Sequence, residues 1–543
     1  MPQYFEIKAN YVDIPNQKIY PALLTVANGK IVQIVPLAEA CLLYLLPGFV
    51  DAHVHIESSM LIPSEFARLA VVHGTVATVS DPHEIANVLG LTGVRFMLQN
   101  AQLTPFKFAF GAPSCVPATP FETAGASLNV TEIAQLFTQD GLKYLAEMMN
   151  WPGVLHHDQI VYEKIAVAQK YGKPVDGHAP GLRGDQARAY AAAGISTDHE
   201  CFTREEALDK LACGMKILIR EGSAAKNFAA LVDLLTDHWE NIMFCSDDKH
   251  PDSLVEGHLN QLASRAVKHG IDVFKVLQAV CINPVLHYDL PVGLLRPGDP
   301  ADFILVEDLW DFKVNQTWLE GQLVAEAGQS LLPSVAVEPI NHFRATPQAI
   351  TDFRVQATSQ QMRVIEVLDG ELITRTLILP AKIVDGWALS DPQNDILKIT
   401  VVNRYAAAPP AVAFIRNFGL KSGAIASSVA HDSHNIIAVG CDDAALCRAV
   451  NLVIAAQGGI SACDGASEQV LPLPVAGLMS AMDGYEVARA YSALDQFAKS
   501  LGSPLKSPYM SLSFMALLVI PALKLSDKGL FDGEKFTFVD LFV

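Results

Sequence analysis

Four ionisable side chains occupy alternate positions in one short, otherwise apolar stretch, PGFVDAHVHIESSM at residues 47–60. They are Asp51, His53, His55 and Glu57. Successive side chains of a strand point to opposite faces, so in a strand these four share one face and the apolar residues between them share the other. Burying imidazoles and carboxylates costs several kcal/mol unless each group finds a partner. The stretch therefore predicts a site at which these side chains bind a common partner.

More histidines and acids stand at the ends of other short apolar runs between residues 75 and 248. They are His83, Glu84, Glu147, His178, His199, Glu200, Asp247 and Asp248. Any one of them alone is more often a structural hydrogen-bonding residue, a solvated rim group or a helix cap. His-x-His is a stronger signal, because its period of two aims both imidazoles at one point.

The joint pattern predicts metal binding. Four neutral imidazoles and two carboxylates that converge on one point make a ligand set for two divalent cations, with Glu147 as the bridging carboxylate. The predicted ligands are His53, His55, Glu147, His178, His199 and Asp247. Asp51 is expected to hydrogen-bond behind the ligands, because metal-binding side chains are usually oriented by an outer shell of polar groups.

Eight short apolar runs, alternating with helical or connecting stretches, must position these side chains. The runs cover residues 49–55, 75–81, 106–111, 142–150, 173–179, 195–200, 216–222 and 241–248, and helices are expected over 158–172, 185–194, 204–214 and 227–239. This order and length are typical of a (β/α)8 barrel, in which functional groups stand at the carboxyl ends of the strands. An open doubly wound sheet is the alternative, but the chain lacks the glycine-rich phosphate-binding motifs of such folds. The barrel is therefore favoured.

Two further regions flank the predicted barrel, which spans residues 46–299. Residues 1–45 and 300–340 both show short strands and turn signals, so we expect them to form one composite β-sandwich. Residues 345–543 are rich in glycine and alanine and are expected to form a C-terminal α+β domain.

Composition narrows the class of protein. The chain has 543 residues, half of them hydrophobic, which is typical of globular domains. Its net charge of −19 argues against nucleic acid or an anionic membrane surface as a partner. Nine cysteines without a C-x-x-C pair fit reduced thiols. With no signal-peptide pattern and no apolar run long enough to span a bilayer, a cytoplasmic protein is expected.

Several motifs together resemble the adenine deaminases of the amidohydrolase superfamily. They are PGFVDAHVHIESSM, DPHEIANVLG, PSCVPATPFETAGA, AEMMNWPGV, DGHAPGL, STDHE, REGSAAKN and FCSDDKHPD, followed by RPGDPADF, HDSHN (431–435) and AAQGG (455–459). The resemblance is dense from about residue 46 to 300 and continues into the last domain. Glu147 stands where many superfamily members carry a carboxylated lysine, and a glutamate there matches the adenine deaminases.

The resemblance implies hydrolysis of adenine to hypoxanthine and ammonia in purine salvage, a hydrolytic attack on a cyclic amidine C–N bond. His53 and His55 would hold one metal, which also contacts Asp247, and His178 and His199 would hold the second. Family usage implies manganese or iron, and the ligand chemistry also admits zinc. A metal-bridged hydroxide would attack C6, while Asp247 accepts its proton and passes it to the leaving amino group. A homodimer is expected.

Several roles stay open on the sequence alone. Glu200, Glu84 and His83 are all candidates for protonating ring N1, and Glu57, Ser58 and Asp248 are expected to contact the substrate. His431, Asp432 and His434 of HDSHN either close over the barrel mouth or form a hydrogen-bonded turn.

Two other functions compete with adenine deamination. Another hydrolase of the superfamily, such as a cyclic amidase or a deacetylase, shares the metals. A hydantoinase-like scaffold keeps the barrel without catalysis, but the complete ligand set argues against it.

Overall fold

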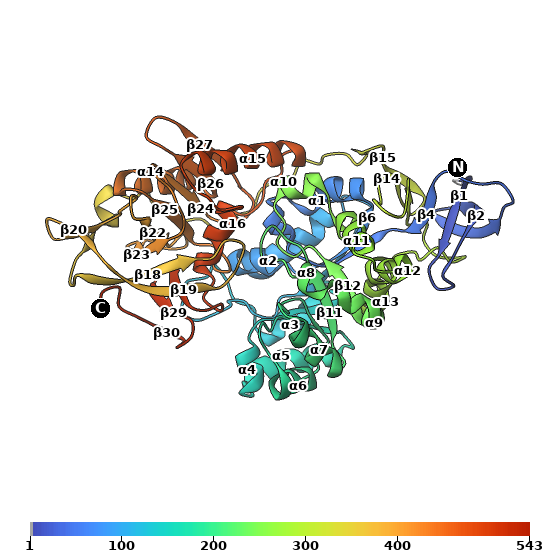
Figure 1. The fold of residues 1–543 in the computed structure, drawn as a ribbon, viewed down its shortest axis with the longest axis horizontal. Coiled ribbons are helices and arrows are strands. Elements are labelled where there is room, and N and C mark those ends of the chain that lie inside the picture. The colour runs from blue at the N-terminus through green and yellow to red at the C-terminus, as the bar shows by residue number, and fades with distance from the viewer. Residues whose placement is uncertain (1–3) are drawn as a thin grey trace.

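The computed structural model describes residues 4–543, so residues 1–3 of the predicted N-terminal β region lie outside the described part. The chain runs from a β-sheet at one end of the molecule, through a barrel, to a C-terminal domain at the other end (Figure 1). No helix within residues 4–543 is long and apolar enough to cross a membrane.

The N-terminal sheet combines strands from both sides of the barrel. Its eight strands, in spatial order, are β16 (Gln329–Ser330), β15 (Gln322–Glu326), β14 (Val314–Leu319), β13 (Phe303–Val306), β4 (Tyr44–Pro47), β1 (Tyr4–Asp13), β2 (Lys18–Ala27) and β3 (Lys30–Pro36). The short strand β4 pairs parallel with β1 and antiparallel with β13. Because β4 leads directly into the first barrel strand, this pairing holds the entry and exit of the barrel together.

Each of the eight predicted runs corresponds to one barrel strand, and only the third strand extends beyond its run, by one residue. The strands are β5 (Phe49–Val54), β6 (Thr75–Ser80), β7 (Lys107–Ala112), β8 (Tyr144–Met148), β9 (Val175–Gly177), β10 (Thr197–Asp198), β11 (Lys216–Arg220) and β12 (Ile242–Cys245). They form two parallel sheets, one from β5 to β9 and the other from β10 to β12. The two sheets are joined at both of their edges by main-chain hydrogen bonds, from Ser196 to Val175 (2.8 Å) and from Asp247 to His53 (2.9 Å). The predicted barrel is confirmed.

Helices cover the outside of the barrel. They include α1 (Pro63–Ala70), α2 (His83–Ala101), α3 (Val130–Thr138), α5 (Gln159–Lys170), α6 (Gly184–Ala192), α7 (Arg204–Ala212) and α11 (Leu259–Lys268). The helix predicted over 227–239 is instead split into α8 (Phe228–Leu231) and α9 (Leu235–His238), with a 3-10 turn between them. Leu231, Val232, Leu234 and Leu235 are all buried, and this spacing is too dense for the single stripe of one regular helix.

The C-terminal domain is built on a second eight-stranded sheet. Its strands, in spatial order, are β19 (Thr374–Pro380), β18 (Gln361–Val367), β23 (Ala411–Arg416), β22 (Ile396–Val402), β25 (Ile436–Gly440), β24 (Ala424–Ser427), β26 (Gly459–Cys463) and β27 (Glu468–Pro472). Helix α14 (Asp443–Ala455) packs on β24, β25 and β26, and α15 (Gly484–Ser500) reaches α1 and α10 (Pro251–Glu256) of the barrel. The HDSHN segment forms the connection between β24 and β25.

Candidate active site

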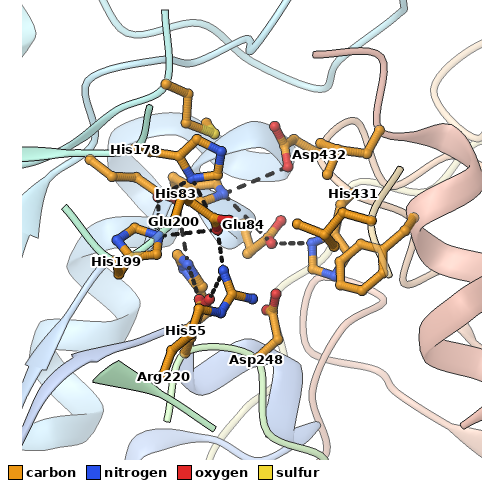
Figure 2. A pocket seen from close by; sticks show the side chains of 16 residues that line it. His55, His83, Glu84, His178, His199, Glu200, Arg220, Asp248, His431 and Asp432 are labelled. Atoms are coloured by element: carbon orange, nitrogen blue, oxygen red, sulfur yellow. Dashed lines mark hydrogen bonds and ion pairs between the residues drawn. The ribbon is translucent and has the colours of Figure 1, made fainter. Parts of the chain in front are cut away.

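A cavity lies between the carboxyl ends of the barrel strands and the C-terminal domain (Figure 2). Of the predicted site residues, those that line it are His55, His83, Glu84, Glu147, His178, His199, Glu200, Asp247 and Asp248. The C-terminal domain contributes Leu372, His431, Asp432, Phe514 and Leu517. The two parts of the chain therefore build one cavity.

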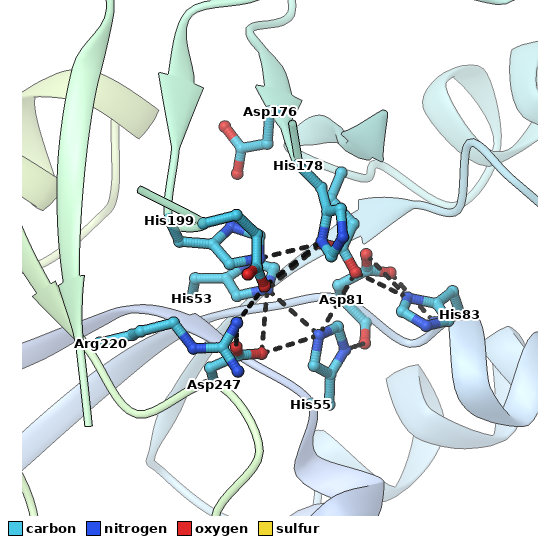
Figure 3. Close-up of polar contacts among 12 residues, drawn as sticks. His53, His55, Asp81, His83, Asp176, His178, His199, Arg220 and Asp247 are labelled. Atoms are coloured by element: carbon cyan, nitrogen blue, oxygen red, sulfur yellow. Dashed lines mark hydrogen bonds and ion pairs between the residues drawn. The ribbon is translucent and has the colours of Figure 1, made fainter. Parts of the chain in front are cut away.

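Glu147, at the end of β8, lies at the centre of the imidazole cluster (Figure 3). Its Oε2 is 2.8 Å from His178 Nδ1 and 3.1 Å from His199 Nε2, whereas its Oε1 is 3.4 Å from His55 Nε2. Oε2 thus faces His178 and His199 while Oε1 faces His55, so the two oxygens point at different imidazoles, as a bridging carboxylate requires. Burial alone would raise the pKa of Glu147, but the neighbouring His178 and His199 hold it well below its usual range.

His53 and His55 point the same way from the end of β5, as their spacing predicts. Their Nε2 atoms are 3.2 Å apart, and Asp247 Oδ1 lies 3.1 Å from His55 and 3.6 Å from His53. Burial, together with His199 and His55, lowers the pKa of His53 well below its usual value. His53 is therefore a neutral imidazole, the form that binds metal ions.

Asp247 occupies an unusual backbone position. Its φ is 53°, in the left-handed region that few residues other than glycine, asparagine and aspartate adopt. Main-chain hydrogen bonds to His53 and from His55 hold it on both sides. This conformation turns the Asp247 carboxylate toward the two imidazoles.

These side chains fit a divalent metal centre. Two groups of donor atoms that lie within 4.8 Å of one another are His53, His199 and Asp247, and Glu147, His178 and His199. All of these residues are buried, so without a cation several donors would face one another at a large desolvation cost. Imidazole and carboxylate ligands suit manganese, iron and zinc alike.

Arg220, which the sequence reasoning missed, joins two acids of the site. It is 1% exposed, and its Nη1 contacts Glu200 Oε1 and lies 2.5 Å from Asp247 Oδ2. The signal that could have found it is its place at the end of the seventh predicted run, where a charged residue in a barrel faces the mouth.

Glu84 ties the barrel to the C-terminal domain. One of its carboxylate oxygens contacts His431 Nδ1 and the other contacts His434 Nε2. Burial would raise the pKa of Glu84, but His431 and His434 hold it well below its usual range. The HDSHN segment therefore has both of the roles left open by the sequence, since His434 anchors it and His431 lines the cavity.

His83 lies between two acids at the start of α2. Its Nδ1 is 3.1 Å from Asp81 Oδ2, and its Nε2 is 3.7 Å from Asp432 Oδ1. Burial lowers the pKa of His83, but Asp81, Glu84 and Asp432 outweigh it, so the net shift is well upward.

Glu57 does not sit where the strand pattern places it, and neither Glu57 nor Ser58, both expected to contact the substrate, is among the residues that line the cavity. Strand β5 ends at Val54, and a 3-10 turn over Ile56–Ser59 breaks the alternation, so Glu57 leaves the face it would share with His55. Its Oε1 accepts a hydrogen bond from the main chain of Ile85 (3.2 Å). Ser58 donates to Asp248 Oδ1 (2.5 Å), which places Asp248 rather than Ser58 at the cavity.

Asp51 lies behind the cluster. Its carboxylate accepts from the main chain and hydroxyl of Ser246 and is 2.9 Å from His258 Nε2. It therefore ties the end of β12 to β5 and fixes the segment that leads into Asp247.

Known proteins and family models match this chain over nearly its whole length. Residues 44–324 match the model of the amidohydrolase family, and residues 371–537 match that of the adenine deaminase C-terminal domain. The adenine deaminase of Salinibacter ruber is 55% identical over all of both chains. That of Sulfurovum sp. is 56% identical over 98% of this chain and 99% of its own, and that of Methanosarcina mazei is 50% identical over 98% of each. The chain therefore belongs to the adenine deaminase family of the amidohydrolases.

Proposed function

We propose that this protein hydrolyses adenine to hypoxanthine and ammonia, as a step of purine salvage. One observation carries the proposal: a buried set of four imidazoles with Glu147 and Asp247 lines or adjoins one cavity, in a chain that matches adenine deaminases over its full length. A scaffold protein would have no need of such a set, since burying it is costly.

The proposed cofactor is a pair of divalent cations, manganese or iron, with zinc admitted by the same ligands. One ion would be held by His53, His55 and Asp247. The other would be held by His178 and His199, and Glu147 would be a ligand of both ions. When bound, such ions polarise the substrate and lower the pKa of water to about 7.

Asp247 is the proposed proton carrier. It would accept a proton from the attacking water and deliver it to the amino group that leaves C6. Arg220 orients this carboxylate, because it binds Oδ2 of Asp247 and leaves Oδ1 directed at His53 and His55.

We infer that Glu200 or His83, rather than Glu84, protonates ring N1. Both oxygens of Glu84 are occupied by imidazoles, so we assign it to holding the C-terminal domain. Glu200 and His83 remain, and both line the cavity. Comparing the kcat of the Glu200→Gln and His83→Asn variants at constant metal content distinguishes these two candidates.

The test of the function is direct. The protein, purified with added manganese, should convert adenine to hypoxanthine with release of ammonia and should leave a hydantoin unchanged. Turnover of the hydantoin but not of adenine would assign it to the cyclic amidases instead. All nine cysteines are free thiols, which supports a cytosolic setting. The expected homodimer is tested separately, by light scattering.

A further inference from the structure

The C-terminal domain supplies an apolar wall to a cavity whose other lining residues, apart from Met149, are ionisable. Leu372, Phe514 and Leu517 line it, and each is no more than 6% exposed. The ring of Phe514 stacks on the imidazole of His431 with centroids 5.1 Å apart and planes at 24°. We define these three residues as the apolar wall.

Phe514, one residue of the apolar wall, lies away from the predicted metal ligands His178 and His199. Figure 2 shows His431, on which Phe514 stacks, across the cavity from His178 and His199. In adenine, C6 and N9 lie at opposite ends of the fused ring. A purine whose C6 faces the imidazole cluster therefore turns its N9 end toward the C-terminal domain.

Two separate segments form the apolar wall, and Lys524 joins them. Leu372 lies in the turn between β18 and β19, whereas Phe514 and Leu517 follow helix α16 (Pro508–Ser513). Lys524, in β28 (Leu523–Ser526), is fully buried, and its Nζ donates to the main-chain oxygens of Leu372 (2.6 Å) and Phe514 (2.9 Å).

The chemistry of Lys524 suits this linking role. Its two acceptors are neutral carbonyls, and a neutral amine has two N–H groups to donate to them. Burial lowers the pKa of Lys524 to about 7, so near neutral pH much of the population is uncharged. On its other side, the turn that carries Leu372 is held to the barrel by a hydrogen bond from Ala225 N to Gly370 O (2.9 Å).

We propose that the apolar wall determines specificity for the free purine base, and that Lys524 is the positioning residue that holds it. The inference rests on the proposed adenine deamination. A wall packed on the N9 end of the base stands where the ribose of a nucleoside would lie, so nucleosides are excluded.

The first test compares two buried lysines of the same domain. Lys524→Met removes both hydrogen bonds to the wall, while Lys398→Met removes a buried lysine that bonds Phe353 O and Asp443 and is absent from the cavity lining. We expect Lys524→Met to raise KM for adenine about tenfold with kcat changed by no more than about threefold. Lys398→Met should leave both constants near wild type. A folded Lys524→Met protein with wild-type KM would overturn the role of Lys524.

The second test acts on the apolar wall directly and does not depend on Lys524→Met folding. Phe514→Leu and Leu517→Ala should each raise the ratio of kcat/KM for adenosine to that for adenine by at least about tenfold. An unchanged ratio in both variants, with adenine still turned over, would overturn the specificity role. Absence of adenine turnover in the wild-type protein loaded with manganese would instead overturn the proposed function.

Discussion

The guanidinium of Arg220 lies 2.5 Å from Oδ2 of Asp247, and both side chains are no more than 2% exposed. The same Nη1 also contacts Glu200. Arg220 thus joins the ends of three neighbouring strands, β10, β11 and β12, at the point where the proposed proton carrier stands. This relationship makes the geometry of Asp247 depend on a residue that is not a metal ligand.

Replacing Arg220 should impair catalysis while sparing the metals. Arg220→Met leaves Asp247 and Glu200 as buried charges without their cation, which costs about 3–5 kcal/mol of stability. We expect kcat to fall at least about 100-fold with both metals retained, as measured by adenine turnover and metal analysis. Arg220→Lys is the control that keeps the charge. Metal loss equal to the activity loss would contradict this assignment.

Asp247→Asn should abolish turnover and keep the fold. The amide is isosteric with the carboxylate but cannot accept and return a proton, so kcat should fall by about 100-fold or more. Thermal unfolding should remain within a few degrees of wild type. Near-full kcat in this variant would rule out proton transfer by Asp247.

Glu147→Gln should lose metal. The amide offers one neutral oxygen where the carboxylate offers two charged ones, so it bridges poorly between the two groups of histidines. Elemental analysis should show less than two metal equivalents, while Glu163→Gln on the exposed face of α5 should keep the wild-type content. Wild-type metal content in Glu147→Gln would show that Glu147 does not bridge.

Glu84→Gln should loosen the C-terminal domain from the barrel. The change weakens two charge-assisted contacts, to His431 and His434, which are each stronger than neutral hydrogen bonds. We expect a higher KM for adenine and faster proteolysis or hydrogen exchange in residues 429–435. Unchanged exchange in this segment would indicate that Glu84 does not anchor it.

Lys524 predicts a pH dependence of stability. Its pKa is about 7 in the folded protein and 10.5 as the ordinary value, so between these pH values the unfolded chain binds a proton that the folded chain lacks. The stability of the wild type relative to Lys524→Met should therefore rise with pH, by up to about 1.4 kcal/mol per pH unit. Denaturant midpoints of both proteins at pH 7 and pH 9.5 measure this. A difference that is independent of pH would contradict the shifted pKa.

Local pattern alone was enough to predict the barrel and to bring most of the buried imidazoles and carboxylates to one mouth. Apolar runs of strand length mark β5 to β12, and because parallel strands end at one edge, polar residues at those ends could be assigned to one mouth. The motifs around His53, Glu147 and Asp247 also indicated the adenine deaminase family correctly.

Only the tertiary structure decided how the cluster is completed and covered. A 3-10 turn, not visible in the alternation of residues 51–57, removes Glu57 from the face that carries His55. Arg220 looks like an ordinary strand-end charge until its partners at the ends of β10 and β12 are known. Leu372, Phe514 and Lys524 are brought together with the barrel mouth across more than a hundred residues of sequence. Periodicity reports which way a side chain faces within its own element, whereas a cavity wall depends on which distant elements pack together.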